Sequence, residues 1–282
     1  MADRRDIKPR LGGPEMTTAQ LFRLDGRTVL ISGGAGDLGL AVAESVLETG
    51  GDVVCLDLRE TPPAEPWARL ESLAAQHGTQ IAYHQADVTD ADRISAVFAG
   101  LRRLRYPLRG VVACAGIGNS TSAVNFDVAK FRRTLDVNLT GTFLVAQAAA
   151  REMRRHGQSG SMVLVASMAG SVAMRGSDVA DYESSKAATI GLGRSLAKEW
   201  SSQAGFPLIR VNTLSPGYIK TGMLNPMLRA FPDAEKNIAD LNMMNRLSFA
   251  DEYRAPAVFL LADGSGFMTG ADLKVDGGHT AW

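Results

Sequence analysis

The sequence is poor in the residues that build metal centres and disulfide frameworks. Its 282 residues include two cysteines and four histidines, the latter at positions 77, 84, 156 and 279. The histidines are too scattered to form a metal-binding pair, so the sequence predicts no metal site. Cys55 and Cys114 both lie in apolar runs typical of strands, and we expect buried thiols there, not a disulfide.

The chain also has no excess of charge and no long apolar run. Its 30 basic and 30 acidic residues give a formal net charge of zero, which provides no electrostatic footprint for nucleic acid. No run reaches the ~18 apolar residues of a membrane-spanning helix, and the N-terminus lacks the hydrophobic segment of a secretory signal. We expect a cytoplasmic protein that binds a small molecule, with no nucleic-acid or membrane partner.

What the sequence does contain is enough apolar material for one large domain. Hydrophobic residues make up 45% of the chain, and no composition shift marks an internal linker. The polar stretches Asp-Arg-Arg-Asp and Pro-Arg-Leu-Gly-Gly-Pro near the start carry no core signal. We therefore predict a flexible tail over residues 1–23 and a single domain over residues 24–282.

Strand and helix patterns alternate along this domain. Short apolar, β-branched runs predict strands near 28–32, 52–57, 80–86, 109–114, 161–167, 207–214 and 271–275. Apolar-periodic segments predict helices over 38–50, 63–77, 90–105, 126–156, 180–203 and 251–262. This alternation predicts an α/β fold with a doubly wound parallel sheet of about seven strands and helices on both faces. Ligands of such sheets bind outside the carboxyl ends of the strands.

The first predicted strand runs into a glycine cluster, Ser-Gly-Gly-Ala-Gly-Asp-Leu-Gly, over residues 32–39. Glycines allow a tight turn and close approach of a pyrophosphate, which is stabilised by the N–H groups and dipole of the following helix. The second strand ends in Asp57, 18 residues after Gly39. A carboxylate that binds ribose hydroxyls is expected ~20 residues after the glycine motif. The order of these features, a strand, a glycine turn, a helix, a second strand and an acid, predicts a dinucleotide site.

A second feature is the pair Tyr182 and Lys186, at i and i+4 in a segment that reads as a helix. This spacing places both side chains on one helical face. A free tyrosine titrates near pH ~10, and a nearby cation favours its phenolate and lowers that pKa. The pair is a candidate for acid–base catalysis, although the same spacing also occurs as an ordinary amphipathic contact.

Together these motifs resemble the short-chain dehydrogenase/reductase family, and the resemblance runs from about Leu24 to Trp282. It implies a Rossmann-type fold. The family's Thr-Gly-x-x-x-Gly-x-Gly motif maps onto Ser32, Gly33, Asp37 and Gly39. Asp37 departs from the family's middle glycine, and we expect its side chain to point outward or to cap the helix.

Further segments carry the same resemblance. Asp87-Val-Thr-Asp is similar to the adenine loop, and Ser-Pro-Gly-Tyr-Ile-Lys-Thr over 215–221 to the nicotinamide segment. Ala113 and Cys114 replace both amides of the family's Asn-Asn-Ala-Gly. The resemblance implies cofactor contacts from Ser32, Gly33, Asp37, Leu38, Gly39, Asp57, Leu58, Asp87, Val88, Ala115, Gly116, Tyr182, Lys186, Pro216, Gly217, Ile219 and Thr221.

The catalytic serine of the family needs to be placed by pattern. The commonest family spacing before the tyrosine falls on Ala169, whereas the Ser-x-x-Gly pattern selects Ser167, two residues further from Tyr182. The mannitol and sorbose reductase branch looks like the second arrangement. The resemblance thus implies Asn138, Ser167, Tyr182 and Lys186 as catalytic residues, with Asn138 holding a water in the proton relay. A chain that lacks the serine is the alternative.

Cofactor and substrate follow from the same positions. Asp57 favours NAD, because a carboxylate there repels the 2′-phosphate of NADP, whereas Arg59 is the residue that would favour NADP. The C-terminal residues 275–282 resemble those of sugar and polyol members, so we expect a sugar, polyol or ketose substrate. The rival is a secondary-metabolite ketone. The methionine-rich segment 222–249 is predicted to be a lid or a helical hairpin.

A different class of function stays open at this point. Asp37, the residues at 113–114 and Ala169 would suit a nucleotide-binding protein with a non-redox or scaffold role, whereas the residues implied as catalytic favour an active oxidoreductase. The helical segments 126–156 and 180–203 would, in this family, pair between subunits. We therefore expect a homotetramer or homodimer.

Overall fold

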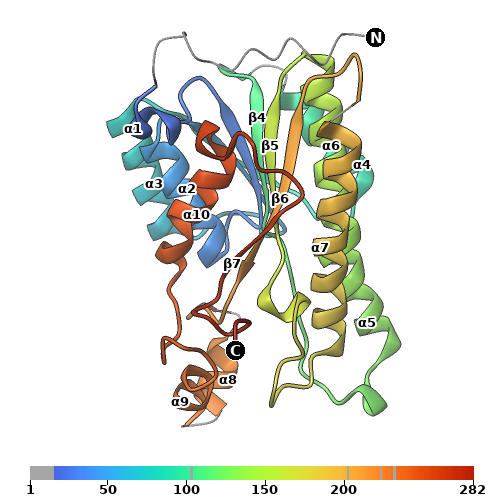
Figure 1. Ribbon diagram of the computed structural model, residues 1–282. Helices are drawn as coiled ribbons and strands as arrows, with labels where there is room; N and C mark the ends of the chain where they lie inside the picture. The colour runs from blue at the N-terminus through green and yellow to red at the C-terminus, as the bar shows by residue number, and fades with distance from the viewer. Residues whose placement is uncertain (1–15, 102–103, 202, 223, 231–232) are drawn as a thin grey trace.

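The protein is built around one parallel sheet. The computed structural model describes residues 16–101, 104–201, 203–222, 224–230 and 233–282 (Figure 1). Within these residues the sheet has seven strands in the order β3-β2-β1-β4-β5-β6-β7. The strands are β1 (Thr28–Ser32), β2 (Asp52–Asp57), β3 (Ile81–Gln85), β4 (Leu108–Ala113), β5 (Gly160–Val165), β6 (Ile209–Pro216) and β7 (Asp272–Val275). The strand order reverses between β1 and β4, which is where such folds bind their ligands.

Helices cover both faces of the sheet, so the predicted doubly wound architecture is confirmed (Figure 1). One face carries α2 (Asp37–Glu48), α3 (Ala64–His77) and α10 (Arg254–Leu261), whose apolar residues share one core cluster with β1 and β2. The other carries α4 (Ala91–Gly100), α5 (Val128–Leu135), α6 (Thr142–Arg155) and α7 (Ala180–Ser201), and a second cluster lies beneath α4, α6 and α7. Short 3-10 turns are η3 (Ala123–Asn125), η5 (Met168–Gly170), η6 (Ala250–Tyr253) and η7 (Asp263–Ser265).

Some predicted helices differ in extent from those observed. The segment predicted as one helix over 126–156 is divided into α5 and α6 by a π-helical turn, η4 (Asp136–Gly141). The helix predicted over 90–105 ends at Gly100. The segment 222–249 contains α8 (Asn225–Ala230) and α9 (Ala234–Ala239), which lie beyond the carboxyl ends of the strands in Figure 1. Positions 223, 231 and 232 of that segment lie outside the described residues.

The N-terminal part of the chain is described from residue 16 onward. Residues 1–15 of the predicted tail lie outside the described residues, and residues 16–23 include the short helix α1 (Thr18–Leu21). Arg23 pairs with Asp25 at 2.6 Å, which joins this segment to the start of the domain. In the described part of the chain, no helix combines the length and the apolar character needed to cross a membrane.

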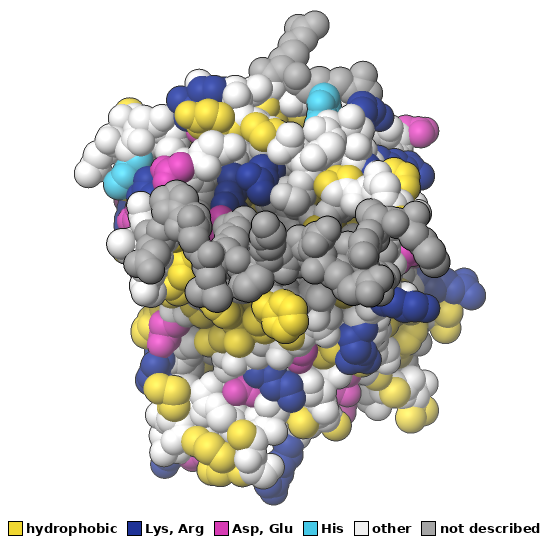
Figure 2. All heavy atoms as spheres, turned by 45° about the horizontal axis from the view of Figure 1, so that its top comes forward, with side chains coloured by type: hydrophobic (Ala, Val, Ile, Leu, Met, Phe, Trp, Pro, Cys, Tyr) yellow, Lys and Arg dark blue, Asp and Glu magenta, His cyan; other side chains and the backbone are white. Residues whose placement is uncertain are grey.

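The end of the molecule opposite the carboxyl ends of the strands has a mixed charge. In Figure 2 the Lys and Arg side chains on the coloured part of this surface are interspersed with acidic and apolar ones. Arg210 of β6 is buried near this end, where its guanidinium donates to the carbonyls of Leu260, Ala262 and Met268. This arginine therefore has a structural role in terminating α10.

Candidate active site

The loops at the carboxyl ends of the strands enclose one large cleft. Its volume is about 2230 Å³, well above the ~300–1,000 Å³ of a typical small-molecule pocket. A dinucleotide and a substrate would fit together in that volume. The predicted residues that line it are Gly33, Asp37, Leu38, Gly39, Asp57, Leu58, Asp87, Val88, Ala115, Gly116, Ser167, Tyr182, Lys186, Pro216, Gly217, Ile219 and Thr221. The other two predicted residues, Ser32 and Asn138, are buried behind its wall, at 1% and 0% exposure.

The glycine turn after β1 forms one wall of this cleft, and its geometry requires glycine. Gly33 has a φ of +69°, and a Cβ there would lie 2.7 Å from the backbone nitrogen of Ala115. A Cβ on Gly39 would lie 2.2 Å from the carbonyl oxygen of Gly33. Helix α2 follows with Gly36 as its N-cap and no side-chain cap. The first turn of α2 thus presents backbone N–H groups to the cleft, which suits a pyrophosphate.

Asp37 is the first residue of α2 and does not cap it. Its carboxylate instead reaches across to a distant segment, where Oδ2 accepts the backbone N–H of Gly222 at 2.7 Å. Of the two orientations expected for Asp37, pointing outward or capping the helix, capping is not observed. The side chain leaves the glycine turn and makes a contact across the cleft.

Asp57 stands at the end of β2, beside the glycine turn. Its Oδ2 accepts the N–H of Ala35 at 3.0 Å, and its Oδ1 accepts the N–H of Arg59 at 3.1 Å. The Arg59 guanidinium donates in turn to the carbonyl of Ala35 at 3.1 Å. A carboxylate and a cation are thus held side by side at the place where the ribose of a bound dinucleotide would lie.

Asp87, on the wall of the cleft, makes an ion pair that the sequence did not reveal. It accepts from Arg133 of α5 at 2.9 Å and from the backbone and hydroxyl of Thr89 at 2.9 and 2.8 Å. These hydrogen bonds outweigh burial and lower the pKa of the Asp87 carboxyl. Nothing in the spacing of Arg133 along its helix distinguishes it from a solvated basic residue. Only the folded structure shows that it pairs with Asp87.

Tyr182, in the first turn of α7, lies against Ser167, which follows β5. Burial raises the pKa of the Tyr182 phenol, and the hydrogen bond with Ser167 opposes that effect. Ser167 is 7% exposed, and its Oγ also accepts the N–H of Ala169 at 3.2 Å. Of the two candidate positions for the serine, Ser167 brings its hydroxyl to the tyrosine, whereas Ala169 has no hydroxyl to offer.

Lys186 lies one turn further along α7 and is 4% exposed. Its Nζ donates to the carbonyl oxygen of Val165 at 2.8 Å and lies 5.5 Å from the centre of the Tyr182 ring. Burial lowers the pKa of this lysine to about 8, as desolvation of an ammonium should. The expected lowering of the Tyr182 pKa by Lys186 is wrong, because burial of the phenol dominates and raises that pKa.

Asn138 lies in the π-helical turn η4 and uses its whole amide to hold a loop in place. Its Oδ1 accepts the N–H of Ile117 at 2.8 Å, and its Nδ2 donates to the carbonyl of Ile117 at 2.8 Å and to Ser185 Oγ at 2.9 Å. Gly116 lies between it and the lysine, since a Cβ there would be 3.4 Å from Asn138 Oδ1 and 3.5 Å from Lys186 Nζ. Asn138 therefore connects η4, the turn between α5 and α6, to the loop after β4.

The position of Cys114 differs from the buried strand position that the sequence predicts. Strand β4 ends at Ala113, so Cys114 lies just beyond it and is half-buried on the wall of the cleft, not sealed inside the sheet. Burial raises the pKa of its thiol to about 11, and the charge of Lys186 opposes this rise. Cys55, in contrast, is fully buried as expected.

The part of the cleft formed by the segments after β4, β5 and β6 has many apolar side chains, which the sequence indicated only in part. Its apolar residues are Ile117, Met168, Ala169, Met174, Val179, Tyr218, Leu224, Ile238 and Leu241. Among its polar groups, Asn119 is already engaged, donating to Asp181 Oδ2 at 2.8 Å and to Thr134 Oγ1 at 3.1 Å. Arg175 and Asp178 are exposed at the rim.

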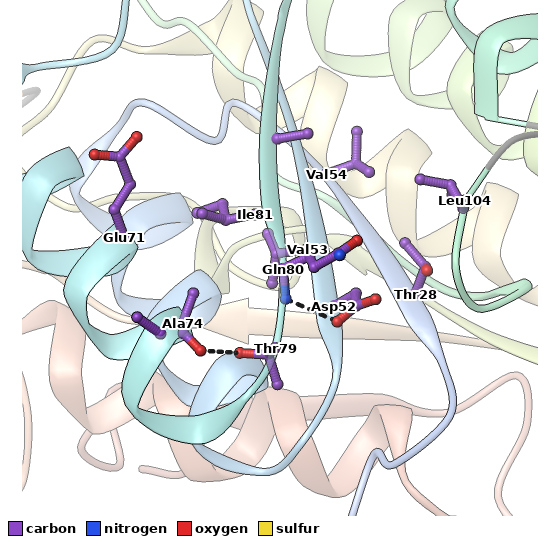
Figure 3. A pocket seen from close by; sticks show the side chains of 12 residues that line it. Thr28, Asp52, Val53, Val54, Glu71, Ala74, Thr79, Gln80, Ile81 and Leu104 are labelled. Atoms are coloured by element: carbon purple, nitrogen blue, oxygen red, sulfur yellow. Dashed lines mark hydrogen bonds between the residues drawn. The ribbon is translucent and has the colours of Figure 1, made fainter.

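A smaller hollow of about 400 Å³ lies at the opposite edge of the sheet, beside α3 (Figure 3). Its polar side chains serve the protein itself. Asp52 accepts from Gln80 and Arg105, Glu71 accepts from Trp67, and the Thr79 hydroxyl donates to the carbonyl of Ala74. We therefore assign the chemistry to the large cleft. Over the described ranges, no cluster of three or more His, Cys, Asp or Glu could hold a metal ion.

Comparison with known proteins gives matches along nearly the whole chain. Residues 33–280 match a family model described as enoyl-(acyl carrier protein) reductase. A short chain dehydrogenases/reductase, notP′, from Aspergillus versicolor is 52% identical over 279 residues, covering 99% of this chain and 95% of the relative. Galactitol 2-dehydrogenase (L-tagatose-forming) from Cereibacter sphaeroides is 34% identical over 263 residues, covering 93% and 98%. The crystal structure of a gluconate 5-dehydrogenase from Burkholderia cenocepacia, in complex with NADP and tartrate, is similar with a TM-score of 0.83 at 28% identity, covering 94% of this chain and 100% of that one.

Proposed function

This chain belongs to the short-chain dehydrogenase/reductase family, and we propose that it interconverts a secondary alcohol and a ketone with a nicotinamide dinucleotide. One observation carries the proposal. Ser167, Tyr182 and Lys186 line the same cleft as the glycine turn and Asp57. A proton donor and a dinucleotide cradle thus share one enclosed space.

The residues present fit the cofactor. The glycine turn has no room for a Cβ at Gly33 or Gly39, and the first turn of α2 has no side-chain cap, so its N–H groups suit the pyrophosphate. Asp57 suits the adenine ribose, and Ile219 and Thr221 line the part of the cleft assigned to the nicotinamide. When bound, the nicotinamide would supply or accept the hydride. We propose NAD as the preferred form, since the fixed Asp57 carboxylate repels a 2′-phosphate, with Arg59 as the group that opposes this preference.

Proton transfer falls to Tyr182. Its raised pKa keeps the phenol protonated at neutral pH, which suits donation to a carbonyl oxygen during reduction. Ser167 would hydrogen-bond the same oxygen and hold it against the phenol. Alcohol oxidation needs the phenolate, which the Lys186 ammonium would stabilise. Asn138 fixes the loop behind the lysine, where a water could join the relay.

Two substrate classes remain, each with its own support. A sugar alcohol or ketose is favoured by the likeness of the C-terminal segment to polyol members and by relatives such as the galactitol 2-dehydrogenase. A bulkier, more apolar ketone, such as a secondary metabolite, is favoured by the wall that Met168, Met174, Tyr218 and Ile238 form. A polyol hydroxyl buried against Met168, Met174 or Ile238 would find no hydrogen-bond partner on those side chains. Homotetramer or homodimer assembly and a cytoplasmic location stay predictions.

The test is turnover followed by absorbance at 340 nm with NADH or NADPH and two panels of carbonyl compounds. One panel holds ketoses, and the other holds cyclic and aryl ketones of similar carbonyl reactivity. We expect oxidation of NADH with at least one panel, and the better panel identifies the substrate class. Tight binding of nucleotide without turnover on any carbonyl or alcohol would refute the redox proposal and favour a non-redox or scaffold role.

A further inference from the structure

The contact between Asp37 and Gly222 joins the two walls of the cleft. Asp37 begins α2 next to the glycine turn, and Gly222 begins the long segment that carries α8 and α9. The two residues are 185 positions apart, and the hydrogen bond between Oδ2 and the Gly222 N–H is 2.7 Å long. A glycine at position 37, as in the family motif, could not make this contact.

The segment held by this contact is the one that leads to the nicotinamide end. On one side it is fixed to residue 248, through the bridge between Ile219 and Ser248 and the bond from Lys220 N–H to the Ser248 carbonyl at 2.9 Å. On the other side it turns into α8, because the Thr221 carbonyl accepts from the N–H groups of Leu224 and Asn225 at 3.0 Å each. Asp37 fastens the stretch between these two attachments to the glycine turn.

The charge of the Asp37 carboxylate also disfavours binding of the cofactor. The first turn of α2 is where a pyrophosphate would bind, and the Gly222 N–H is a neutral partner that leaves the charge of Asp37 in place. The Asp37 carboxylate and a pyrophosphate bound at this helix turn would carry like charges and repel one another. Only a structural gain would offset that repulsion, and the contact with Gly222 supplies it.

We propose that Asp37 is a positioning residue whose hydrogen bond to Gly222, the clasp, holds the 219–222 segment over the bound dinucleotide, while its charge weakens nucleotide binding. The clasp fixes the position of Thr221 on the wall of the cleft and holds the start of α8 in place. This inference uses the proposed function only in placing a nucleotide in the cleft. It accounts for an acid at a position where the family has glycine.

The experiment compares Asp37→Asn with Asp37→Ala. Asparagine keeps an acceptor oxygen for the Gly222 N–H and removes the charge, whereas alanine removes both. Both variants lose the favourable acid at the helix N-terminus, so that effect cancels in the comparison. We expect both to bind NADH at least about threefold more tightly than wild type. We expect Asp37→Ala to release NADH at least about fivefold faster than Asp37→Asn in stopped-flow fluorescence, and to have a kcat about tenfold lower.

A readout independent of turnover is tryptic cleavage after Arg229, an exposed residue of α8. Loss of the clasp should speed this cleavage about fivefold in Asp37→Ala relative to Asp37→Asn. Gly222→Ala is the matched control, because it keeps the N–H donor and its Cβ would lie 3.6 Å from Asp37 Oδ2, an ordinary contact. It should be cleaved at the wild-type rate.

Equal NADH release and equal cleavage in Asp37→Asn and Asp37→Ala would overturn the proposal. Different release and cleavage rates in a protein that turns over no carbonyl compound would support the clasp while refuting the proposed reaction. The two claims therefore fail separately.

Discussion

Replacing Lys186 with methionine should stabilise the fold at neutral pH while removing activity. The folded protein lowers the pKa of this lysine from 10.5 to about 8 by burying it. At about 1.4 kcal/mol per pKa unit, keeping the ammonium charged at pH 7 costs about 3 kcal/mol. Methionine has a similar length and no charge, but it leaves the Val165 carbonyl without its 2.8 Å hydrogen bond, which costs about 1 kcal/mol. The net gain expected for Lys186→Met is about 2 kcal/mol.

The pH dependence of that gain follows from the direction of the shift. Between pH 8 and 10.5 the unfolded chain binds more protons at Lys186 than the folded chain, so wild-type stability rises with pH across this window. The advantage of Lys186→Met is therefore complete below pH 8 and disappears towards pH 10.5. Urea unfolding at fixed protein concentration, at pH 7 and pH 10, measures it. Lys130→Met, at an exposed position of α5, is the control. A Lys186→Met protein that is less stable than wild type at pH 7 would refute the reasoning.

Three further substitutions test other parts of the site. Ser167→Ala should lower kcat by about 10²–10³-fold with little change in NADH affinity, because it removes one hydrogen-bond donor to the reacting oxygen; a kcat within threefold of wild type contradicts the assignment. Asp57→Ala should shift the ratio of NADPH to NADH affinity upward by at least about tenfold in a nicotinamide-fluorescence titration, since it removes a repulsive carboxylate; an unchanged ratio would mean that Asp57 does not select the cofactor. Thr134→Val should lower the free energy of unfolding in urea by about 1–3 kcal/mol, because the buried Asp181 carboxylate loses the hydrogen bond of 2.6 Å from the Thr134 hydroxyl. An unchanged free energy of unfolding would show that water replaces the hydroxyl.

The sheet and its ligand edge could be predicted from the sequence because its inner strands are buried on both faces. Such strands appear as continuous apolar runs, and the runs ending at Ser32 and Asp57 gave the bounds of β1 and β2 as the structure has them. Both of these runs end in a polar residue where the chain leaves the sheet. The carboxyl ends of parallel strands meet at one edge, so the topology alone brought the predicted residues to one cleft.

Features that depend on tertiary contacts could not be predicted in this way. The π-helical turn around Asn138 interrupts a segment whose periodicity favours one continuous helix, and its stabilising partners are Ile117 and Ser185, far away in the chain. The partner of Asp37 is likewise distant, since no local pattern connects it to Gly222.

Small errors in strand ends also had consequences. The fourth strand was predicted to run to 114, but it ends at Ala113, which is enough to move Cys114 from the core to the wall of the cleft. The direction of the Tyr182 pKa depends on how deeply the phenol is buried, and spacing along a helix does not report burial.

The measurement that tests the central claim most directly compares wild type with Tyr182→Phe. Phenylalanine keeps the ring that packs beside Ser167 and removes only the phenolic hydroxyl. With the best substrate found, we expect turnover to fall by at least about 10³-fold while the Kd for NADH stays within about twofold of wild type. Turnover retained in Tyr182→Phe would show that another group transfers the proton and would contradict the account.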